Sequence, residues 1–159
     1  MTRKTEEAFT WIVQVLRDHK IPFQISGGFA ANIYGSSRPL ADIDIEIPDE
    51  KVYCIQEVVK RFIIYGPTRY KDKEFDLLLM TLKYKGQEID ICGVTSQKVF
   101  DKKTKKWSSE RVDFSKVKRK KAFNLLVPVI PLKRLISYKK KILRDVDIQD
   151  IQALSSMTL

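Results

Sequence analysis

An acidic and an apolar side chain alternate strictly along Asp42-Ile43-Asp44-Ile45-Glu46-Ile47. Such period-2 alternation is typical of a β-strand with one face in a hydrophobic core and the other face polar. The isoleucines would then supply the core, and the three acids would form a row on the opposite face. Neighbouring carboxylates on one sheet face repel each other unless a cation lies between them or solvent covers them. This strand therefore predicts either a metal site or an edge strand with a solvated acidic face.

A glycine turn, Ser26-Gly27-Gly28, lies sixteen residues before Asp42. It follows a short predicted strand over 23–26 and opens a predicted short helix from Phe29 to Tyr34, which Gly35 ends. Glycines at the start of a helix let backbone N–H groups come close to a phosphate, and the helix dipole favours its negative charge. A simple tight turn would also use two glycines, so this motif gains meaning only from its neighbours.

A third acid, Asp90, lies in a second alternating segment, Glu88-Ile89-Asp90-Ile91-Cys92. The two isoleucines are expected to pack inward, which puts Asp90 on the polar face of its strand. The segment belongs to a predicted hairpin whose strands, 75–83 and 87–94, are joined by a tight turn at 84–86. Three strand-borne acids and a glycine turn form the set needed to hold two divalent cations against a triphosphate.

Helices are expected around these strands. Apolar spacing predicts helices over 5–20, 48–62, 131–144 and 146–157, with further strands over 62–65 and 125–130. His19 is expected near the end of the first helix as a partner of the helix dipole. The order of elements predicts a mixed α/β (α+β) domain with a partly antiparallel sheet.

The chain is strongly basic, with 30 Lys and Arg against 20 Asp and Glu and a formal net charge of +10 over 159 residues. Residues 101–144 hold 16 Lys and Arg against 3 Asp and Glu, so the rest of the chain sums to −3. A segment this basic indicates a polyanionic partner, such as nucleic acid or a triphosphate, or else a lysine surface that serves solubility. Because apolar residues are sparse over 101–121, loops and short pieces are expected there.

Composition argues against several protein classes. A hydrophobic fraction of 43% suffices for a core, so wholesale disorder is not expected. No apolar run approaches the roughly 18–20 residues of a membrane span, and residues 1–7 are polar, so a cytoplasmic protein without a membrane partner is expected. Cys54 and Cys92 are too few for a disulfide framework or a four-ligand zinc site, and both are expected as free thiols.

The motifs over 26–47 and 86–93 resemble those of the nucleotidyltransferase superfamily with the DNA polymerase β-like fold. The family pattern is a Gly-Gly or Gly-Ser turn opening a short helix, then an Asp-x-Asp strand, then a third Asp on a later strand. The segment from Ser26 to Gly35, with Arg38 ahead of Asp42, is similar to a small bacterial and archaeal subset. That subset includes lincosamide-type antibiotic nucleotidyltransferases and toxin nucleotidyltransferases of abortive-infection systems. Leu40 is a departure, since many relatives carry Thr there.

The resemblance implies a catalytic core over 1–130 and a C-terminal helical extension over 131–159, packed together as one domain. It implies that Asp42, Asp44 and Asp90 are catalytic and hold two Mg²⁺ or Mn²⁺ ions. The nucleotide-binding residues that it implies are Ser26, Gly27, Gly28, Arg38 and Lys139.

Lys139 also stands out by its position. It falls within the apolar stripe of the predicted helix over 131–144. A lysine on an inner helix face must extend its amine to solvent, pair with a carboxylate or meet an anion. The similar family segment implies a contact with the nucleotide phosphates, whereas Arg144, Asp147 and Asp150 are expected to form ion pairs between the last two helices.

The activity implied by the resemblance is the transfer of an NMP from an NTP such as ATP to a hydroxyl, with release of pyrophosphate. The acceptor is left open among RNA (including tRNA), a small molecule and a protein. An antitoxin or a second copy of the chain are the further partners that the family suggests. The alternative is a non-catalytic, basic nucleic-acid-binding module that keeps the fold. A metal-dependent nuclease is disfavoured, because hydrolysis needs no cradle for a triphosphate.

Overall fold

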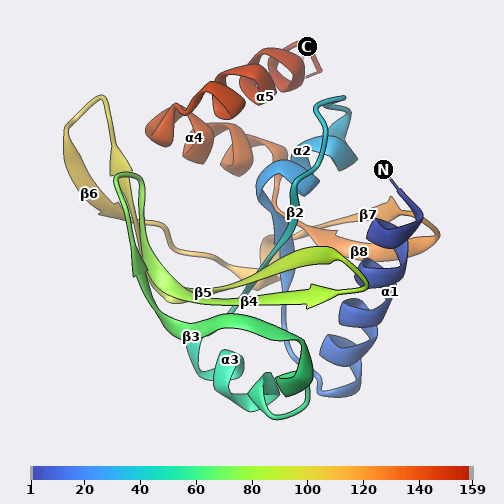
Figure 1. The fold of residues 1–159 in the computed structure, drawn as a ribbon. Helices are drawn as coiled ribbons and strands as arrows, with labels where there is room; N and C mark the ends of the chain where they lie inside the picture. The colour runs from blue at the N-terminus through green and yellow to red at the C-terminus, as the bar shows by residue number, and fades with distance from the viewer. Residues whose placement is uncertain (1, 158–159) are drawn as a thin grey trace.

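The computed structural model describes residues 2–157, which form a mixed β-sheet with helices on both sides (Figure 1). The strands are β1 (Gln24–Ser26), β2 (Asp42–Ile47), β3 (Ile63–Lys71), β4 (Phe75–Tyr84), β5 (Gln87–Asp101), β6 (Lys106–Ser109), β7 (Lys118–Ala122) and β8 (Leu125–Val129). The helices are α1 (Arg3–Asp18), α2 (Gly27–Tyr34), α3 (Asp49–Gln56), α4 (Leu132–Ile142) and α5 (Asp145–Ser155). Two 3₁₀ turns lie at Lys60–Phe62 and Phe114–Lys116.

The sheet has the strand order β3-β4-β5-β2-β1-β8-β7, and β6 pairs with β5 outside this path. β2 pairs antiparallel with β1 and parallel with β5, whereas β3, β4 and β5 form consecutive antiparallel pairs. The predicted mixed, partly antiparallel sheet is therefore confirmed. The alternative of an acidic edge strand is wrong for β2, because a strand pairs with it on each side.

The apolar face of β2 lies in the core. Ile43, Ile45 and Ile47 are fully buried and belong to the same hydrophobic cluster as Phe9 of α1 and Val52 of α3. Burial of such apolar surface is the main favourable term in folding. In Figure 1, α1 and α3 lie on one side of the sheet and α4 and α5 on the other. The acidic face of β2 therefore points toward α4 and α5.

The basic segment 101–121 differs from its prediction as loops and short pieces. β5 continues to Asp101, and the segment also contains β6 and β7. Both strands lie at margins of the sheet, where charged side chains remain in water and only a residue such as Ala122 is buried. The period-2 apolar signal was absent because these strands have little core to cover.

Several element ends also differ from the predictions. α1 begins at Arg3, two residues before its predicted start, with Thr2 as its N-cap, and α2 begins at Gly27 instead of Phe29. α3 ends at Gln56, well before the predicted 62, and β3 is longer than its prediction. His19 is the C-cap of α1, and its Nδ1 lies 2.8 Å from the carbonyl oxygen of Val15.

The β4–β5 hairpin forms as predicted. Lys85 and Gly86 connect the strands with φ values of 48° and 84°, the left-handed conformations that a two-residue hairpin turn requires. Farther along, the register shifts at a bulge. Leu78 pairs with Gly93, but Asp76 pairs with Lys98, so β5 has four residues where β4 has one.

The predicted helices over 131–144 and 146–157 correspond to α4 and α5, which pack against each other and against α2. The domain boundary at residue 130 stays a prediction, and residues 1, 158 and 159 lie outside the described part of the chain. No helix within 2–157 combines the length and apolar character needed to cross a membrane. Cys54 and Cys92 are free thiols, as expected.

Candidate active site

The three predicted acids meet on one face of the sheet because β2 and β5 run parallel and in register. Asp44 lies directly opposite Asp90, and Asp42 lies opposite Glu88. One carboxylate oxygen from each of Asp42, Asp44 and Asp90 lies within 4.8 Å of the other two. This spacing suits carboxylates that share divalent cations.

The row of paired residues continues across the sheet on both sides of the acids. Ser26 of β1 pairs with Asp44, while Thr81 of β4 pairs with Asp90 and Tyr65 of β3 pairs with Thr81. The Thr81 hydroxyl donates a 2.7 Å hydrogen bond to Oδ1 of Asp90. One carboxylate of the three is thereby held by a neighbouring strand.

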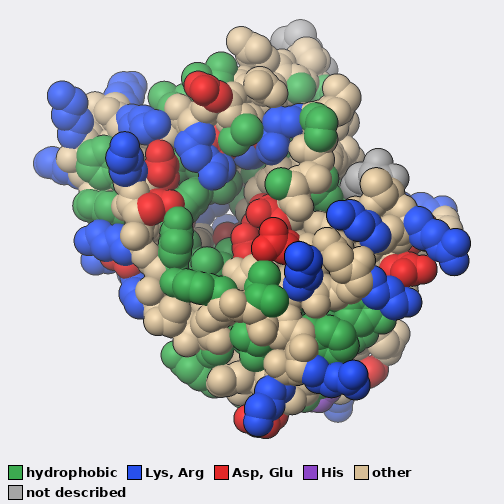
Figure 2. All heavy atoms as spheres, in the orientation of Figure 1, with side chains coloured by type: hydrophobic (Ala, Val, Ile, Leu, Met, Phe, Trp, Pro, Cys, Tyr) green, Lys and Arg blue, Asp and Glu red, His purple; other side chains and the backbone are tan. Residues whose placement is uncertain are grey.

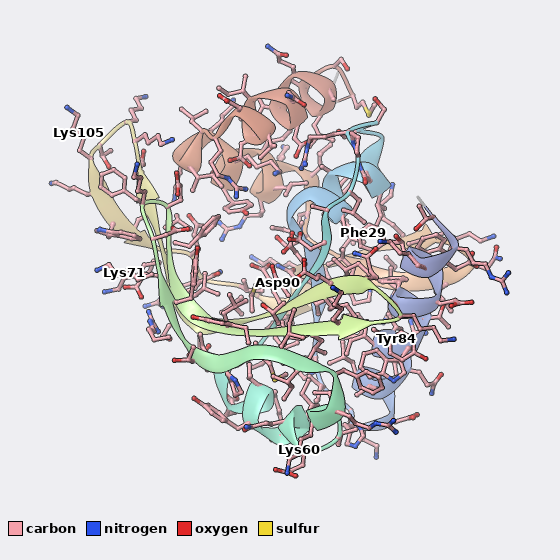
Figure 3. All side chains as sticks on the ribbon, viewed as in Figure 1. Phe29, Lys60, Lys71, Tyr84, Asp90 and Lys105 are labelled. Carbon is pink, nitrogen blue, oxygen red and sulfur yellow. The ribbon has the colours of Figure 1, made fainter. Side chains whose placement is uncertain are left out.

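A cleft of about 560 Å³ lies over this row. Its floor is the sheet, and Tyr138, Arg144 and Val146 from the α4–α5 region form the opposite wall. Figure 2 shows acidic side chains gathered in a hollow at the centre of this face, with basic side chains around it. Figure 3 places Asp90 near the middle of the sheet. The acids are thus open to a ligand of nucleotide size.

The two glycines of the turn are required by their surroundings. Gly27 has a φ of 59°, and a Cβ at this residue would lie 2.0 Å from Oδ2 of Asp44. A Cβ at Gly28 would lie 2.6 Å from Nη2 of Arg38. Any side chain at either position would therefore displace a predicted metal ligand or a predicted phosphate ligand. The turn brings the start of α2 directly against the acids.

The carboxyl groups of the three acids have raised pKa values. Burial, together with the charges of Asp42 and Asp90, raises the pKa of Asp44 well above its ordinary value. Burial and the charge of Glu88 raise the pKa of Asp42, and burial raises the pKa of Asp90 to about 6 despite the hydrogen bond from Thr81. Within residues 2–157, no Lys or Arg forms an ion pair with Asp42, Asp44 or Asp90. Clustered, unpaired carboxylate oxygens are the donor set that Mg²⁺ and Mn²⁺ prefer, so these residues fit the predicted metals.

Two arginines contribute positive charge to the cleft. Arg38 donates to both oxygens of Asp150, from Nε at 3.0 Å and from Nη2 at 2.8 Å. Arg144 donates from Nε to Asp147 at 2.8 Å, and its guanidinium carbon lies 5.1 Å from the ring centre of Phe75. Both guanidinium groups are therefore fixed in place beside the acids.

Lys139 lies behind Arg38 and does not line the cleft, because both side chains bind Oδ2 of Asp150. Its side chain is fully buried, and Nζ lies 3.0 Å from Oδ1 of Asp147 and 3.0 Å from Oδ2 of Asp150. A buried ammonium is stable only when it is paired, and two carboxylates occupy this one. The expected direct contact with phosphate does not fit this placement. Lys139 instead connects the carboxylates that hold Arg38 and Arg144.

The expected ion pairs at the C-terminal helices are confirmed in part. Lys139 joins α4 to α5 through Asp147 and Asp150. Arg144, however, pairs with Asp147 within the first turn of α5, and its backbone N–H also donates a 3.0 Å hydrogen bond to Oδ2 of Asp147. Asp150 also reaches Arg38, which sequence reasoning did not predict.

Sequence reasoning missed Thr81, Tyr65 and Tyr138 as residues of the cleft. A signal for Thr81 was present, because a two-residue turn at 85–86 fixes the hairpin register and puts Thr81 opposite Asp90. Tyr65 is reached through a register shift between β3 and β4, and Tyr138 arrives from α4. Neither position follows from local sequence spacing.

The comparisons with known proteins agree with this architecture. No protein-family model matches the sequence, and no curated protein matches it. Among solved structures, a provisionally assigned nucleotidyltransferase from Thermotoga maritima matches with a TM-score of 0.74 and 19% identity, over 99% of this chain and 96% of that one. The lincosamide antibiotic adenylyltransferase LnuA, in its lincomycin-bound structure, matches with a TM-score of 0.63 and 16% identity, over 98% of this chain and 99% of that one.

A third similar structure is ANT(2″)-Ia in complex with adenylyl-2″-tobramycin. It matches with a TM-score of 0.61 and 12% identity, over 96% of this chain and 88% of that one. At these identities the likeness concerns the fold. The chain has the nucleotidyltransferase fold, as the resemblance of its motifs predicted.

Proposed function

We propose that this chain is a metal-dependent nucleotidyltransferase, which moves an NMP from an NTP to an acceptor hydroxyl and releases pyrophosphate. The observation that carries the proposal is the meeting of Asp42, Asp44 and Asp90 within 4.8 Å, directly beside the Gly27-Gly28 start of α2. The similar structures support it, since two of them are adenylyltransferases by name, one bound to lincomycin and one bound to adenylyl-2″-tobramycin.

The three aspartates would hold the divalent cations, for which we propose two Mg²⁺ or Mn²⁺ ions. Bound there, such ions would offset the charge of the triphosphate and lower the pKa of the acceptor hydroxyl. The unpaired state of the three carboxylates supports this role, because two cations would offset the repulsion that raises the pKa of Asp44.

The start of α2 and the arginines would bind the nucleotide. Backbone N–H groups at Gly27 and Gly28 lie at the positive end of the helix dipole, where phosphate oxygens bind well. Ser26, which caps this helix, faces the same cleft, and Arg38 and Arg144 supply fixed positive charge. Lys139 would act indirectly, by holding the carboxylates that orient these two arginines.

The chemical step then follows from these positions. The acceptor oxygen attacks the α-phosphorus and forms a new P–O bond. The bond from the α-phosphorus to its bridging oxygen breaks, and pyrophosphate leaves with the electron pair. The acceptor proton passes to Oδ2 of Asp90, because Oδ1 already accepts the hydrogen bond from Thr81. The arginines hold the phosphates in line for this attack.

The proposal is tested with labelled NTPs, Mg²⁺, total RNA and total cellular protein. The native chain should label one class of acceptor, and Asp42→Asn and Asp44→Asn should abolish the labelling. Glu50→Gln, an exposed acid of α3, is the matched control and should label normally. Failure of the native chain to bind any NTP with Mg²⁺ or Mn²⁺ in calorimetry would overturn the proposal.

The second candidate is a non-catalytic, nucleic-acid-binding module with the same fold. The observation in its favour is the abundance of exposed lysines on the segment 102–121. It predicts salt-dependent RNA binding that Asp42→Asn and Asp44→Asn leave unchanged, together with no transfer from any NTP.

A further inference from the structure

Two β-hairpins project side by side at one end of the cleft and expose lysines. The β3–β4 hairpin turns at 72–74 and the β5–β6 hairpin turns at 102–105. The backbone N–H of Phe100 donates to the carbonyl of Glu74 at 2.9 Å, which holds the two hairpins together. Figure 3 shows Lys71 and Lys105 on this same edge of the molecule. The exposed lysines here are Lys71, Lys73, Lys102, Lys103, Lys105 and Lys106, and we call them the lysine track.

The carboxylates near the lysine track accept hydrogen bonds from groups of the hairpins themselves. Asp101 accepts hydrogen bonds from the backbone N–H groups of Lys103 and Thr104. Asp72 accepts from two backbone N–H groups of its own turn and from the hydroxyl of Tyr70. Of the lysine track, only Lys102 forms an ion pair in the described chain, at 4.0 Å from Glu74. The other ammonium groups are therefore available to an external polyanion.

Aromatic rings lie between these lysines and the acids of the cleft. Trp107 is 36% exposed, packs against Phe100 and lies 5.1 Å from Nζ of Lys71. Closer to the acids, Tyr65 and Tyr70 line the cleft with their ring centres 6.4 Å apart. Tyr65 pairs across the sheet with Thr81, the residue that hydrogen bonds to Asp90. Exposed or half-buried rings are thus present both at the hairpins and in the cleft beside the acids.

We infer that the lysine track and the pair Tyr65 and Tyr70 bind single-stranded nucleic acid. Lysines that follow a phosphate backbone, interleaved with aromatic rings on which bases stack, are how proteins bind single strands without sequence preference. In a duplex the faces of the bases are stacked on one another, so they cannot stack on the rings of Tyr65 and Tyr70. On the proposed function, on which this part of the inference rests, the bound strand presents its terminal hydroxyl at Asp90 as the acceptor.

The opposite edge of the sheet offers a matched control. β7 also carries exposed basic side chains, including Arg119 and Lys121, but it lies at the far end of the strand order from β3. Neither of these two residues lines the cleft. Net charge alone would make both edges bind equally, whereas the inference assigns binding to the hairpin edge.

The test measures binding of a fluorescently labelled oligouridylate of about 12 nucleotides by anisotropy, without NTP or divalent metal. Lys103→Glu combined with Lys106→Glu should weaken binding by about tenfold or more and make the salt dependence less steep. Arg119→Glu combined with Lys121→Glu makes the same change in net charge and should weaken binding by less than about threefold. Tyr65→Ala should weaken binding by about fivefold or more.

A second measurement uses the fact that the chain has two tryptophans, Trp11 and Trp107. Trp11→Phe leaves Trp107 as the reporter, and its fluorescence should be quenched in a saturable way by the oligouridylate. The inference is overturned if the oligomer does not bind, if both double variants lose affinity equally, or if duplex RNA or vesicles of anionic lipid bind as tightly as the single strand.

Nucleotide binding separates this inference from the proposed function. The double variant Lys103→Glu and Lys106→Glu should bind an NTP with Mg²⁺ as the native chain does, because neither lysine lines the cleft. Oligouridylate binding without any NTP binding would refute the proposed function and leave the inference standing. NTP binding without oligouridylate binding would refute the inference and leave the proposed function standing.

Discussion

Aspartates gather in two places in this fold, and their pKa values shift in opposite directions in the two places. Over the sheet, one carboxylate oxygen from each of Asp42, Asp44 and Asp90 lies within 4.8 Å of the other two. No ion pair of the described chain involves these three residues, and their pKa values are raised. We call them the sheet cluster. Between α4 and α5, Asp147 and Asp150 are fully buried, each contacts two cations, and their pKa values are lowered. We call these two aspartates and their partners Lys139, Arg38 and Arg144 the helix cluster.

This difference in ion pairing and pKa shifts indicates a different role for each cluster. In the helix cluster, three cations of the chain, Lys139, Arg38 and Arg144, contact two carboxylates. The negative charge of the sheet cluster is not offset by any ion pair of the described chain. The repulsion among its three carboxylates lowers the stability of the fold. On the proposed function, bound divalent cations would offset the charge of the three acids. We therefore expect the helix cluster to stabilise the fold and to orient Arg38 and Arg144, and the sheet cluster to bind a ligand.

The largest expected effect is the loss of transfer when the sheet cluster loses a carboxylate. Asp44→Asn should slow nucleotidyl transfer by about four orders of magnitude, because a metal ligand that contributes several kcal/mol is removed. Labelled product formed per minute is the measurement. Retention of more than about a tenth of native transfer would contradict the ligand role of Asp44.

The next effect concerns the helix cluster. Lys139→Met should lower the free energy of unfolding by about 3–5 kcal/mol, because it leaves Asp147 and Asp150 buried with one cation fewer. Urea unfolding measures this change, and the exposed neighbour Lys140→Met should change it by less than about 0.5 kcal/mol. If Lys139→Met instead leaves stability intact and abolishes NTP binding, Lys139 contacts phosphate, as its sequence position predicted.

The same substitution should have opposite signs in the two clusters. In the presence of EDTA, Asp44→Asn should raise the free energy of unfolding by about 1–2 kcal/mol because it relieves repulsion. Asp147→Asn should lower it by about 2–3 kcal/mol because it breaks contacts with Lys139 and Arg144. Thermal unfolding of both variants provides the comparison, and shifts of the same sign would remove the distinction between the clusters.

The pH dependence of stability should also separate the clusters. The pKa of Asp90 is raised to about 6 in the folded chain, so its contribution to stability is greatest below pH 4 and is lost as the pH rises through 6. The lowered pKa values of Asp147 and Asp150 act in the reverse direction, and their contribution is lost as the pH falls below 4.

Thermal unfolding without metal between pH 3 and pH 8 tests this. Asp90→Asn should flatten the decline between pH 4 and pH 6, an effect of about 1–2 kcal/mol. Added Mg²⁺ should stabilise the native chain more at pH 7.5 than at pH 5, because the metal binds deprotonated carboxylates. Stabilisation by Mg²⁺ that is equal at both pH values would contradict this account.

The smallest expected effect concerns the hydrogen bond that orients Asp90. Thr81→Val removes the 2.7 Å bond to Oδ1 and should weaken Mg²⁺-dependent NTP binding by about fivefold. Thr68→Val, an exposed change on β3, is the control and should have no effect. Calorimetry measures both variants, and equal affinities would show that Asp90 needs no orientation by β4.

Local patterns in the sequence predicted much of the sheet cluster. Period-2 alternation put Asp42 and Asp44 on one strand face and Asp90 on the polar face of another. The parallel register that sets Asp44 opposite Asp90 joins segments more than forty residues apart, and no local pattern encodes it. The glycine turn was visible in the sequence, but the close approach of Gly27 to Asp44 depends on the packing of α2.

The helix cluster shows more clearly what local sequence patterns cannot predict. The apolar stripe around Lys139 identified an amine that needed a partner. The choice among solvent, a carboxylate and an anion depended on how α5 packs on α4, which is a tertiary property. The basic segment 101–121 was predicted as loops for a related reason, since β6 and β7 cover little core and carry no apolar period.

The bulge divides β5 into two parts, each with its own register against β4. On the turn side of the bulge, the tight Lys85-Gly86 turn fixes the position of Asp90. Beyond the bulge, four residues of β5 face one of β4, so the projecting hairpin keeps its own register. Insertions or deletions in the hairpin can therefore accumulate without moving a carboxylate of the cleft. Evolution, or an engineer, could exchange the projecting hairpin while the acids of the cleft stay in place.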